Sequence, residues 1–418
     1  MSKTSLLLFT LLFLGTIISP VFAAEEQVTV ELMWESGEVE AYERDELDNL
    51  IEDFEEEHPS IKIKNNPFVG SSENYQAKLL TRLSSDAGPD IYSVGDNTLF
   101  RYAKAGMTAP APEQFANSLT NNFSEALKDG IISVLTWDDD QLYGVPWKID
   151  YVALWYNKDM FKEAGLTEPP SNLEELREYA IKLTKRENGR VVRSGISLRC
   201  HTGGAGQTDK WINLLTAMGG ELFNKEMTEA VFHNKAGVKA LEYLVDLIYE
   251  DKVDAVDLQP RDKEGFALEK TAMFGREPSV LVFLKDAAPD LNYGLAPFPG
   301  KSIPFIDALC VSAQSKEKEA AWTFLEWLMK PEVFVRWQKR LGSIPLLQPI
   351  ADMPYFQNNE ILSGFVKQPL WNVPKHEKLY EIKIILGDYL EKACYEKLTP
   401  QEALDQAANE INKILQED

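Results

Sequence analysis

Residues 28–34 read VTVELMW, a strand-like run that opens the stretch deciding the fold. A helix is predicted next, because apolar residues recur at i, i+3, i+4 and i+7 over 47–54. Residues 61–63 predict a second strand, 75–84 a second helix and 90–94 (DIYSV) a third strand. This alternation predicts an α/β fold built on a parallel, helix-covered sheet.

Helix-capping patterns mark two later helices. Ser171 precedes a helical pattern and Glu174 can reach back to it, as in a capping box. Thr399, Pro400 and Glu402 form the same pattern before the C-terminal helix, with proline at its first position. We found no internal repeat and no low-complexity linker.

The N-terminus has the layout of a secretory signal peptide. Lys3 is followed by a mainly apolar run over 6–18, and Val21-Phe22-Ala23 offers small residues at the positions a signal peptidase reads. A membrane anchor is the alternative, but the apolar run is too short to span a bilayer comfortably. Cleavage after Ala23 and release into the periplasm are therefore expected, without a lipid anchor.

Chain length and net charge limit the number of lobes and the kinds of binding partner. Removing 23 residues from the 418 leaves 395, which is more than one core usually serves, so two lobes are expected. The formal net charge of −23 becomes −24 when the signal removes one base. Such a charge repels nucleic acid and anionic lipid, which are excluded as partners.

No catalytic or metal-binding motif stands out. The three cysteines (Cys200, Cys310 and Cys394) lack metal-type spacing; buried thiols are expected, and one disulfide stays open. The four histidines also lack ligand spacing, and neither a nucleophile elbow nor a phosphate-binding loop is present. No catalytic residue, metal or cofactor is predicted. A pair of acids acting as a glycoside hydrolase stays open, because spacing cannot show which acids meet.

Several segments, in order, resemble the extracellular sugar-binding proteins of ABC importers, the class that includes maltose-binding protein. The most specific are 143–146 (YGVP) and 153–161 (ALWYNKDMF). Segments 54–63, 272–275 (AMFG) and 296–300 (APFPG) match further landmarks. The resemblance covers nearly the whole mature chain.

This resemblance implies a two-lobed periplasmic-binding-protein fold with a hinge and an interlobe cleft. The expected lobe boundaries place 24–137 and 292–343 in the N-terminal lobe, and 138–291 and 344–418 in the C-terminal lobe. In such a fold the lobes close on the ligand by hinge motion. Aromatic rings then stack on the sugar, while carboxylates and amides bind its hydroxyls.

Ten residues are candidates for ligand contact. Asp96 and Asn97 follow a strand, and such sheets bind ligands at strand carboxyl ends, although an Asx turn is the alternative. The resemblance suggests the others: Trp34, Glu35, Trp147, Asp150, Trp211, Arg276, Asp307 and Trp371. Asp150 matches a ligand-binding carboxylate of the maltose-binding relative, whereas packing is an alternative role for each tryptophan.

The stretch 275–279 (GREPS) lacks the tryptophan that relatives often carry there, which favours a smaller or more polar ligand than a long maltodextrin. Arg276 and Lys148 suggest an acidic sugar or phosphate ester, but the cleft carboxylates argue against a strongly anionic ligand. The resemblance implies a monomeric, high-affinity binding protein that delivers a sugar to ABC permease subunits. A secreted hydrolase and an adhesin or sensor-docking protein are the rival hypotheses.

Overall fold

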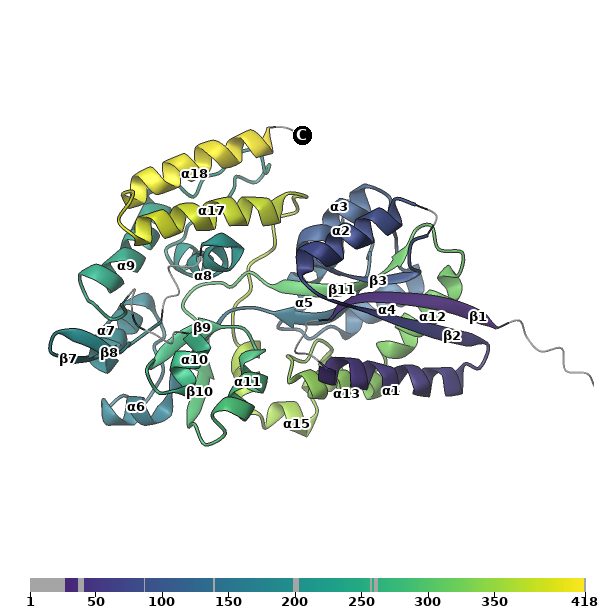
Figure 1. Cartoon of the computed structure of the whole chain (residues 1–418), viewed down its shortest axis with the longest axis horizontal. Helices are drawn as coiled ribbons and strands as arrows, with labels where there is room; N and C mark the ends of the chain where they lie inside the picture. Colours follow the sequence, from purple (N-terminus) through teal and green to yellow (C-terminus); the bar gives the residue numbers. More distant parts are fainter. Residues whose placement is uncertain are drawn as a thin grey trace, which may run out of the picture.

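The computed structural model describes residues 27–36, 41–85, 87–137, 140–197, 203–255, 258 and 262–416. Two lobes lie side by side, and extended segments run between them (Figure 1). The expected two-lobed α/β fold is thereby confirmed. The expected signal peptide and Cys200 lie outside the described residues, while Cys310 and Cys394 are buried free thiols. No helix in the described ranges is long and apolar enough to span a bilayer.

A six-stranded sheet forms the centre of the first lobe, counted over the described residues. Its order is β2-β1-β3-β11-β4, with β5 also pairing with β11. The first three strands run parallel, as expected from their alternation with helices, and β11 is antiparallel to β3, β4 and β5. The strands are β1 (Val28–Ser36), β2 (Ile61–Val69), β3 (Ile91–Gly95), β4 (Thr108–Ala109), β5 (Val145–Asp150) and β11 (Phe305–Ser312).

Helices cover both faces of this sheet, with α2 and α3 on one side and α1 and α13 on the other (Figure 1). The predicted apolar stripe of α1 is buried, and Phe54 from this stripe packs edge-on against Phe324 and Trp327 of α12. The helices of this lobe are α1 (Ala41–Glu57), α2 (Ser72–Leu83), α3 (Asp96–Lys104), α4 (Glu113–Asn122), α5 (Lys128–Leu135), α12 (Lys318–Leu328), α13 (Pro331–Leu341) and α14 (Gln348–Ala351).

The second lobe is mainly helical around the three-stranded sheet β10-β6-β9. Its strands are β6 (Ala153–Asn157), β9 (Met273–Arg276) and β10 (Tyr293–Ala296), and β7 (Lys185–Glu187) and β8 (Arg190–Arg193) form a separate hairpin. The helices are α6 (Lys158–Glu163), α7 (Leu173–Leu183), α8 (Gly204–Ala217), α9 (Lys235–Tyr249), α10 (Asp262–Ala267), α11 (Val280–Ala287), α15 (Pro354–Gln357), α16 (Glu360–Val366), α17 (Leu379–Cys394) and α18 (Pro400–Leu415).

One capping prediction is confirmed and the other is displaced by one residue. Thr399 and Glu402 form the expected capping box of α18. At α7 the cap is Asn172, whose side chain accepts a hydrogen bond from the Glu175 backbone N–H. The Glu175 carboxylate accepts hydrogen bonds from the backbone N–H and the hydroxyl of Ser171, the residue before the cap, so the expected capping box of Ser171 and Glu174 does not form.

Strand pairing shifts the points at which the chain changes lobe. β5 pairs with β11 in the first-lobe sheet, although the expected boundary at 137/138 assigns it to the second lobe. β10 pairs with β6 in the second-lobe sheet, although the boundary at 291/292 assigns it to the first. The pairings therefore favour crossings at 151–152 and 297–304. α14 packs against α13 of the first lobe, whereas α16 packs against β10 of the second lobe. The third crossing therefore follows α14.

The buried residue Ser302 joins two of the crossing segments to the stretch that follows α16. Its hydroxyl donates to the Val152 carbonyl (2.6 Å) and accepts from the Asn213 side-chain amide (2.6 Å). Its backbone N–H donates to the carbonyl of Pro369, and its carbonyl accepts from the backbone N–H of Trp371. Hydrogen bonds thus connect the first two crossings and the stretch after α16 at one point.

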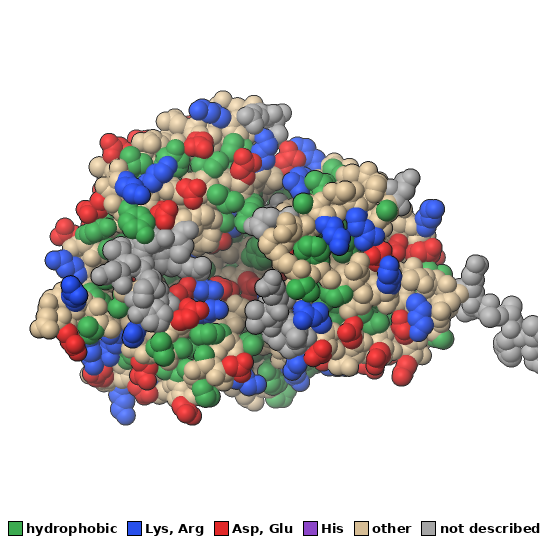
Figure 2. Space-filling view, in the orientation of Figure 1, with side chains coloured by type: hydrophobic (Ala, Val, Ile, Leu, Met, Phe, Trp, Pro, Cys, Tyr) green, Lys and Arg blue, Asp and Glu red, His purple; other side chains and the backbone are tan. Residues whose placement is uncertain are grey.

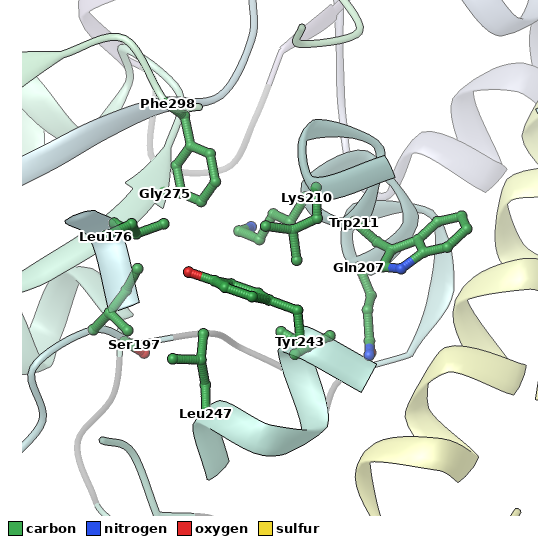
Figure 3. A pocket seen from close by; sticks show the side chains of 12 residues that line it. Leu176, Ser197, Gln207, Lys210, Trp211, Tyr243, Leu247, Gly275 and Phe298 are labelled. Carbon is green, nitrogen blue, oxygen red and sulfur yellow. The ribbon is translucent and has the colours of Figure 1, made fainter. Parts of the chain in front are cut away.

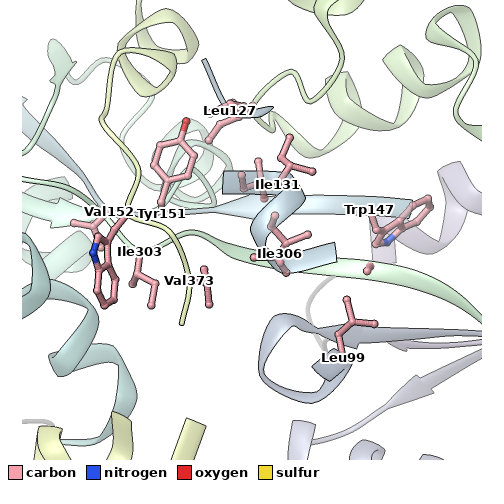
Figure 4. Close-up of a cluster of buried hydrophobic side chains, with 14 of the residues drawn as sticks. Leu99, Leu127, Ile131, Trp147, Tyr151, Val152, Ile303, Ile306 and Val373 are labelled. Atoms are coloured by element: carbon pink, nitrogen blue, oxygen red, sulfur yellow. The ribbon is translucent and has the colours of Figure 1, made fainter. Parts of the chain in front are cut away.

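Apolar side chains surround this junction. Figure 4 shows Tyr151 and Val152 of the first crossing, Ile303 of the second and Val373 of the stretch after α16 close to one another. Ile306 continues the apolar cluster into the first lobe. The connection between the lobes is therefore packed by apolar side chains that are continuous with the main hydrophobic core.

Candidate ligand-binding site

One face of the first-lobe sheet carries a group of charged side chains. Asp307 lies opposite Lys148, and Phe305 lies opposite Asp150, in the β11–β5 register. On its other side Asp307 lies opposite Gly95, the last residue of β3. Directly opposed residues of an antiparallel pair share one face, so these residues gather on one surface. This surface lies at the carboxyl end of β3, where α/β sheets commonly bind ligands.

This face is acidic. The Lys148 Nζ atom lies 3.4 Å from Asp150 Oδ2, and the two side chains are 23% and 18% exposed. One ammonium group therefore faces two carboxylates, those of Asp150 and Asp307. Figure 2 shows the molecular surface hollowed between the two lobes. We call the face formed by Gly95, Lys148, Asp150, Phe305 and Asp307 the carboxylate face.

Three further candidates lie at the carboxyl ends of the neighbouring strands β1 and β3: Glu35, Asp96 and Asn97. Glu35 is the second-last residue of β1, and its backbone N–H donates to Ser93 Oγ (2.9 Å). Asp96 and Asn97 open α3 directly after Gly95. The structure confirms that they follow the strand; their side chains lie outside what it describes.

Arg276 belongs to β9 in the second lobe, where it is bound by two carboxylates. Its Nη1 donates to Asp262 Oδ2 (2.6 Å), and its Nε donates to Glu277 Oε2 (2.7 Å). Its Nη2 also donates to Glu277. Burial disfavours the charged guanidinium, but the carboxylates outweigh this effect and raise the pKa of Arg276. The positive charge is thus compensated within the protein.

Glu277 is one of the two acidic partners of Arg276. Burial alone raises the pKa of its carboxyl group, but the hydrogen bonds and charge of Arg276, with a contribution from Lys210, outweigh burial. The pKa of Glu277 is thereby lowered to about 2. Glu277 is ionised at neutral pH and holds Arg276 in place.

The four candidate tryptophans are buried. Trp34 donates its indole N–H to Asn65 Oδ1 (2.8 Å), and Trp371 donates to Glu221 Oε2 (3.2 Å). Trp147 stacks on Trp337 with ring centroids 3.8 Å apart, at the point where the β5–β11 register shifts and leaves Trp147 without a partner in the pairing. For these residues burial favours the packing role over ligand contact.

The fourth, Trp211, lines a cavity inside the second lobe. Figure 3 shows this cavity, with Tyr243, Leu176 and Phe298 also in its wall. Its volume is about 30 Å³, which is room for roughly one water molecule. Ligand pockets commonly need roughly 300 Å³ or more. The cavity therefore does not hold a sugar, and the hollow between the lobes is the better candidate.

Sequence reasoning missed two members of the carboxylate face, Gly95 and Phe305. The signal for Phe305 is its spacing of two residues from Asp307, which places both on one face of a strand. Gly95 ends the strand just before Asp96. Three or more His, Cys, Asp or Glu side chains do not cluster as a metal site anywhere in the described ranges.

Comparison with known families gives a match over most of the chain. The profile of the bacterial extracellular solute-binding proteins matches residues 40–333. A putative binding protein of Brucella abortus is 26% identical over 323 residues, covering 75% of each chain. The sn-glycerol-3-phosphate-binding periplasmic protein UgpB of Escherichia coli K12 is 25% identical over 436 residues, covering 93% of each.

Solved structures show the same fold. An ABC transporter solute-binding protein of Thermotoga lettingae, bound to α-D-tagatose, is 26% identical, with a TM-score of 0.76; the match covers 93% of this chain and 100% of the other. The sugar-binding protein MalE of Xanthomonas citri is 21% identical with a TM-score of 0.80, covering 93% and 98%.

Proposed function

We propose that this chain, which belongs to the bacterial extracellular solute-binding protein family, captures an uncharged sugar between its lobes for an ABC importer. The observation that carries the proposal is the carboxylate face. Asp150 and Asp307 present charged acceptors at the carboxyl edge of the first sheet, and carboxylates form strong hydrogen bonds with hydroxyl groups. The tagatose-bound relative supports a sugar as the ligand.

A phosphate ester is the rival ligand, because the UgpB relatives bind sn-glycerol-3-phosphate. The charges of this chain argue against it. Arg276 is bound by Asp262 and Glu277, and Lys148 is paired with Asp150. A phosphate group would have to compete with these carboxylates for the cations and would face Asp307 as well. An uncharged ligand meets no such repulsion.

Binding without turnover, periplasmic location and a monomeric state are parts of the same proposal. The relatives support the first, since they are binding proteins of transporters. The periplasmic UgpB supports the second, together with the signal-like N-terminus. The lobes, with boundaries near 151–152 and 297–304, would then close on the ligand by rotation about the Ser302 junction. We retain Glu35, Asp96, Asn97, Asp150, Arg276 and Asp307 as site candidates.

Calorimetric titration with D-tagatose, maltose and sn-glycerol-3-phosphate tests the proposal. We expect a sugar to bind the wild-type protein and sn-glycerol-3-phosphate not to bind. Asp150→Asn should weaken the bound sugar at least about tenfold, because a charged hydrogen bond contributes roughly 1.5–3 kcal/mol. Glu174→Asn, on the exposed start of α7, is the matched control and should leave affinity unchanged.

Two results would count against it. Binding of sn-glycerol-3-phosphate with no sugar binding would make the ligand a phosphate ester. Steady release of new reducing ends from an oligosaccharide would favour a hydrolase over a binding protein.

A further inference from the structure

Phe305 differs from the other partly exposed aromatic side chains. Among the aromatic residues described as intermediate between buried and exposed, every one except Phe305 packs against the main hydrophobic core. Phe305 begins β11 with its side chain on the carboxylate face, opposite in orientation to the buried neighbour Ile306. Its ring is therefore held at the surface of the site and adds little to the core.

The ring lies against the backbone of Gly95. A Cβ atom on Gly95 would be only 2.8 Å from Phe305 Cζ and 3.3 Å from Cε2, closer than such atoms normally approach. The same point is 3.6 Å from Asp307 Oδ1. Glycine at this position lets the ring cover the end of β3, directly beside the Asp307 carboxylate.

Acceptors flank the ring on two sides. Asp307 follows it by two residues on β11, and Asp150 lies directly opposite it on β5. Cross-strand neighbours of this kind have Cβ atoms about 5 Å apart, which is comparable to the width of one sugar ring. A flat apolar surface between two hydroxyl acceptors matches a pyranose, which has an apolar C–H face and hydroxyl groups around its edge.

We infer that Phe305 is the platform on which the C–H face of a pyranose ring stacks, with Asp150 and Asp307 binding hydroxyl groups at its edge. This inference rests on the proposed function and narrows it to closed-ring sugars. An open-chain polyol offers the same hydroxyl groups but no flat apolar face. The site should therefore discriminate between D-tagatose or maltose and sorbitol.

The test compares Phe305→Leu with Phe305→Tyr by calorimetric titration of D-tagatose and maltose. Phe305→Leu keeps an apolar side chain but loses the flat ring, and it should weaken the sugar about tenfold. Phe305→Tyr keeps the ring and should stay within about threefold of wild type. Phe115→Leu, another partly exposed phenylalanine of the first lobe but one that packs on the core, is the matched control and should not change affinity.

A second measurement needs no variant. The ring current of Phe305 should shift the C–H protons of the bound sugar upfield in NMR spectra, and Phe305→Leu should abolish this shift. Wild-type affinity in Phe305→Leu, or no upfield shift in the wild type, would overturn the platform and leave the proposed function standing. If neither sugar binds the wild type, both proposals are wrong.

Discussion

Glu277 is a carboxylate whose ionisation is coupled to the folded state. Its pKa of about 2 is below the ordinary value of 4.5, mainly because Arg276 outweighs the effect of burial. A group with a lowered folded-state pKa contributes stability above its unfolded pKa and loses it as the pH falls through its folded pKa. The contribution of Glu277 should therefore be complete above about pH 4.5 and disappear toward pH 2.

The variant Glu277→Gln should show this loss directly. A difference of this size corresponds to about 3 kcal/mol. The free energy of unfolding in urea should fall less steeply between pH 5 and pH 2 in Glu277→Gln than in the wild type, by up to about that amount. Glu174→Gln, an exposed glutamate, serves as control. Equal slopes for wild type and Glu277→Gln would show that Arg276 does not stabilise the ionised form.

At the scale of elements, the joint between the crossing segments depends on one hydroxyl group. Ser302→Ala removes both hydrogen bonds of that hydroxyl group. The carbonyl of Val152 and the side-chain amide of Asn213, both buried, then lose this hydrogen-bond partner. Unsatisfied buried polar groups cost roughly 1–3 kcal/mol each. We expect urea unfolding to report a loss of about 2–4 kcal/mol. The control Ser363→Ala removes an exposed hydroxyl group that donates to the carbonyl of Glu360, and it should lower the free energy of unfolding much less. An equal loss of stability in both variants would contradict a special role for Ser302.

The elements themselves were largely predictable, but their partners were not. Residue periodicity gave the parallel β1–β3 region, α1 and the capped α18, because these patterns are local. Strand pairing favours another lobe assignment for β5 and β10 than the sequence suggested, because each strand pairs with a segment far away in the chain, and no local pattern encodes that choice. The sequence also left open whether Trp147 contacts ligand or packs inside the protein. Its stacking partner Trp337 is distant in the sequence, so only the folded structure favours the packing role.

The candidate site shows the same division. Asp150 and Asp307 were proposed as single residues, and only the β11–β5 register brings them onto one face. Arg276 looked available for an anion in the sequence, but its carboxylate partner Asp262 becomes a neighbour only through folding. The charge balance that favours an uncharged ligand is thus a tertiary property.

The whole molecule consists of two lobes around a hollow, so ligand binding should change its overall dimensions (Figures 1 and 2). A ligand that contacts both lobes binds the closed conformation more tightly than the open one, and so shifts the population toward the closed conformation. A compact chain of 395 residues, the length without the expected signal, has a radius of gyration of about 21 Å. Small-angle X-ray scattering should show the radius above this value for the free protein and falling toward it with saturating sugar.

The same scattering experiment separates closure from general compaction. Sorbitol and sn-glycerol-3-phosphate at matched concentration should leave the radius unchanged, because neither is expected to stack on Phe305 between Asp150 and Asp307. Phe305→Leu should need about ten times more sugar for half of the change, since closure is coupled to the same contacts. A radius that stays constant while calorimetry reports saturation would mean that the sugar binds one lobe alone, and that the lobes do not move to enclose it.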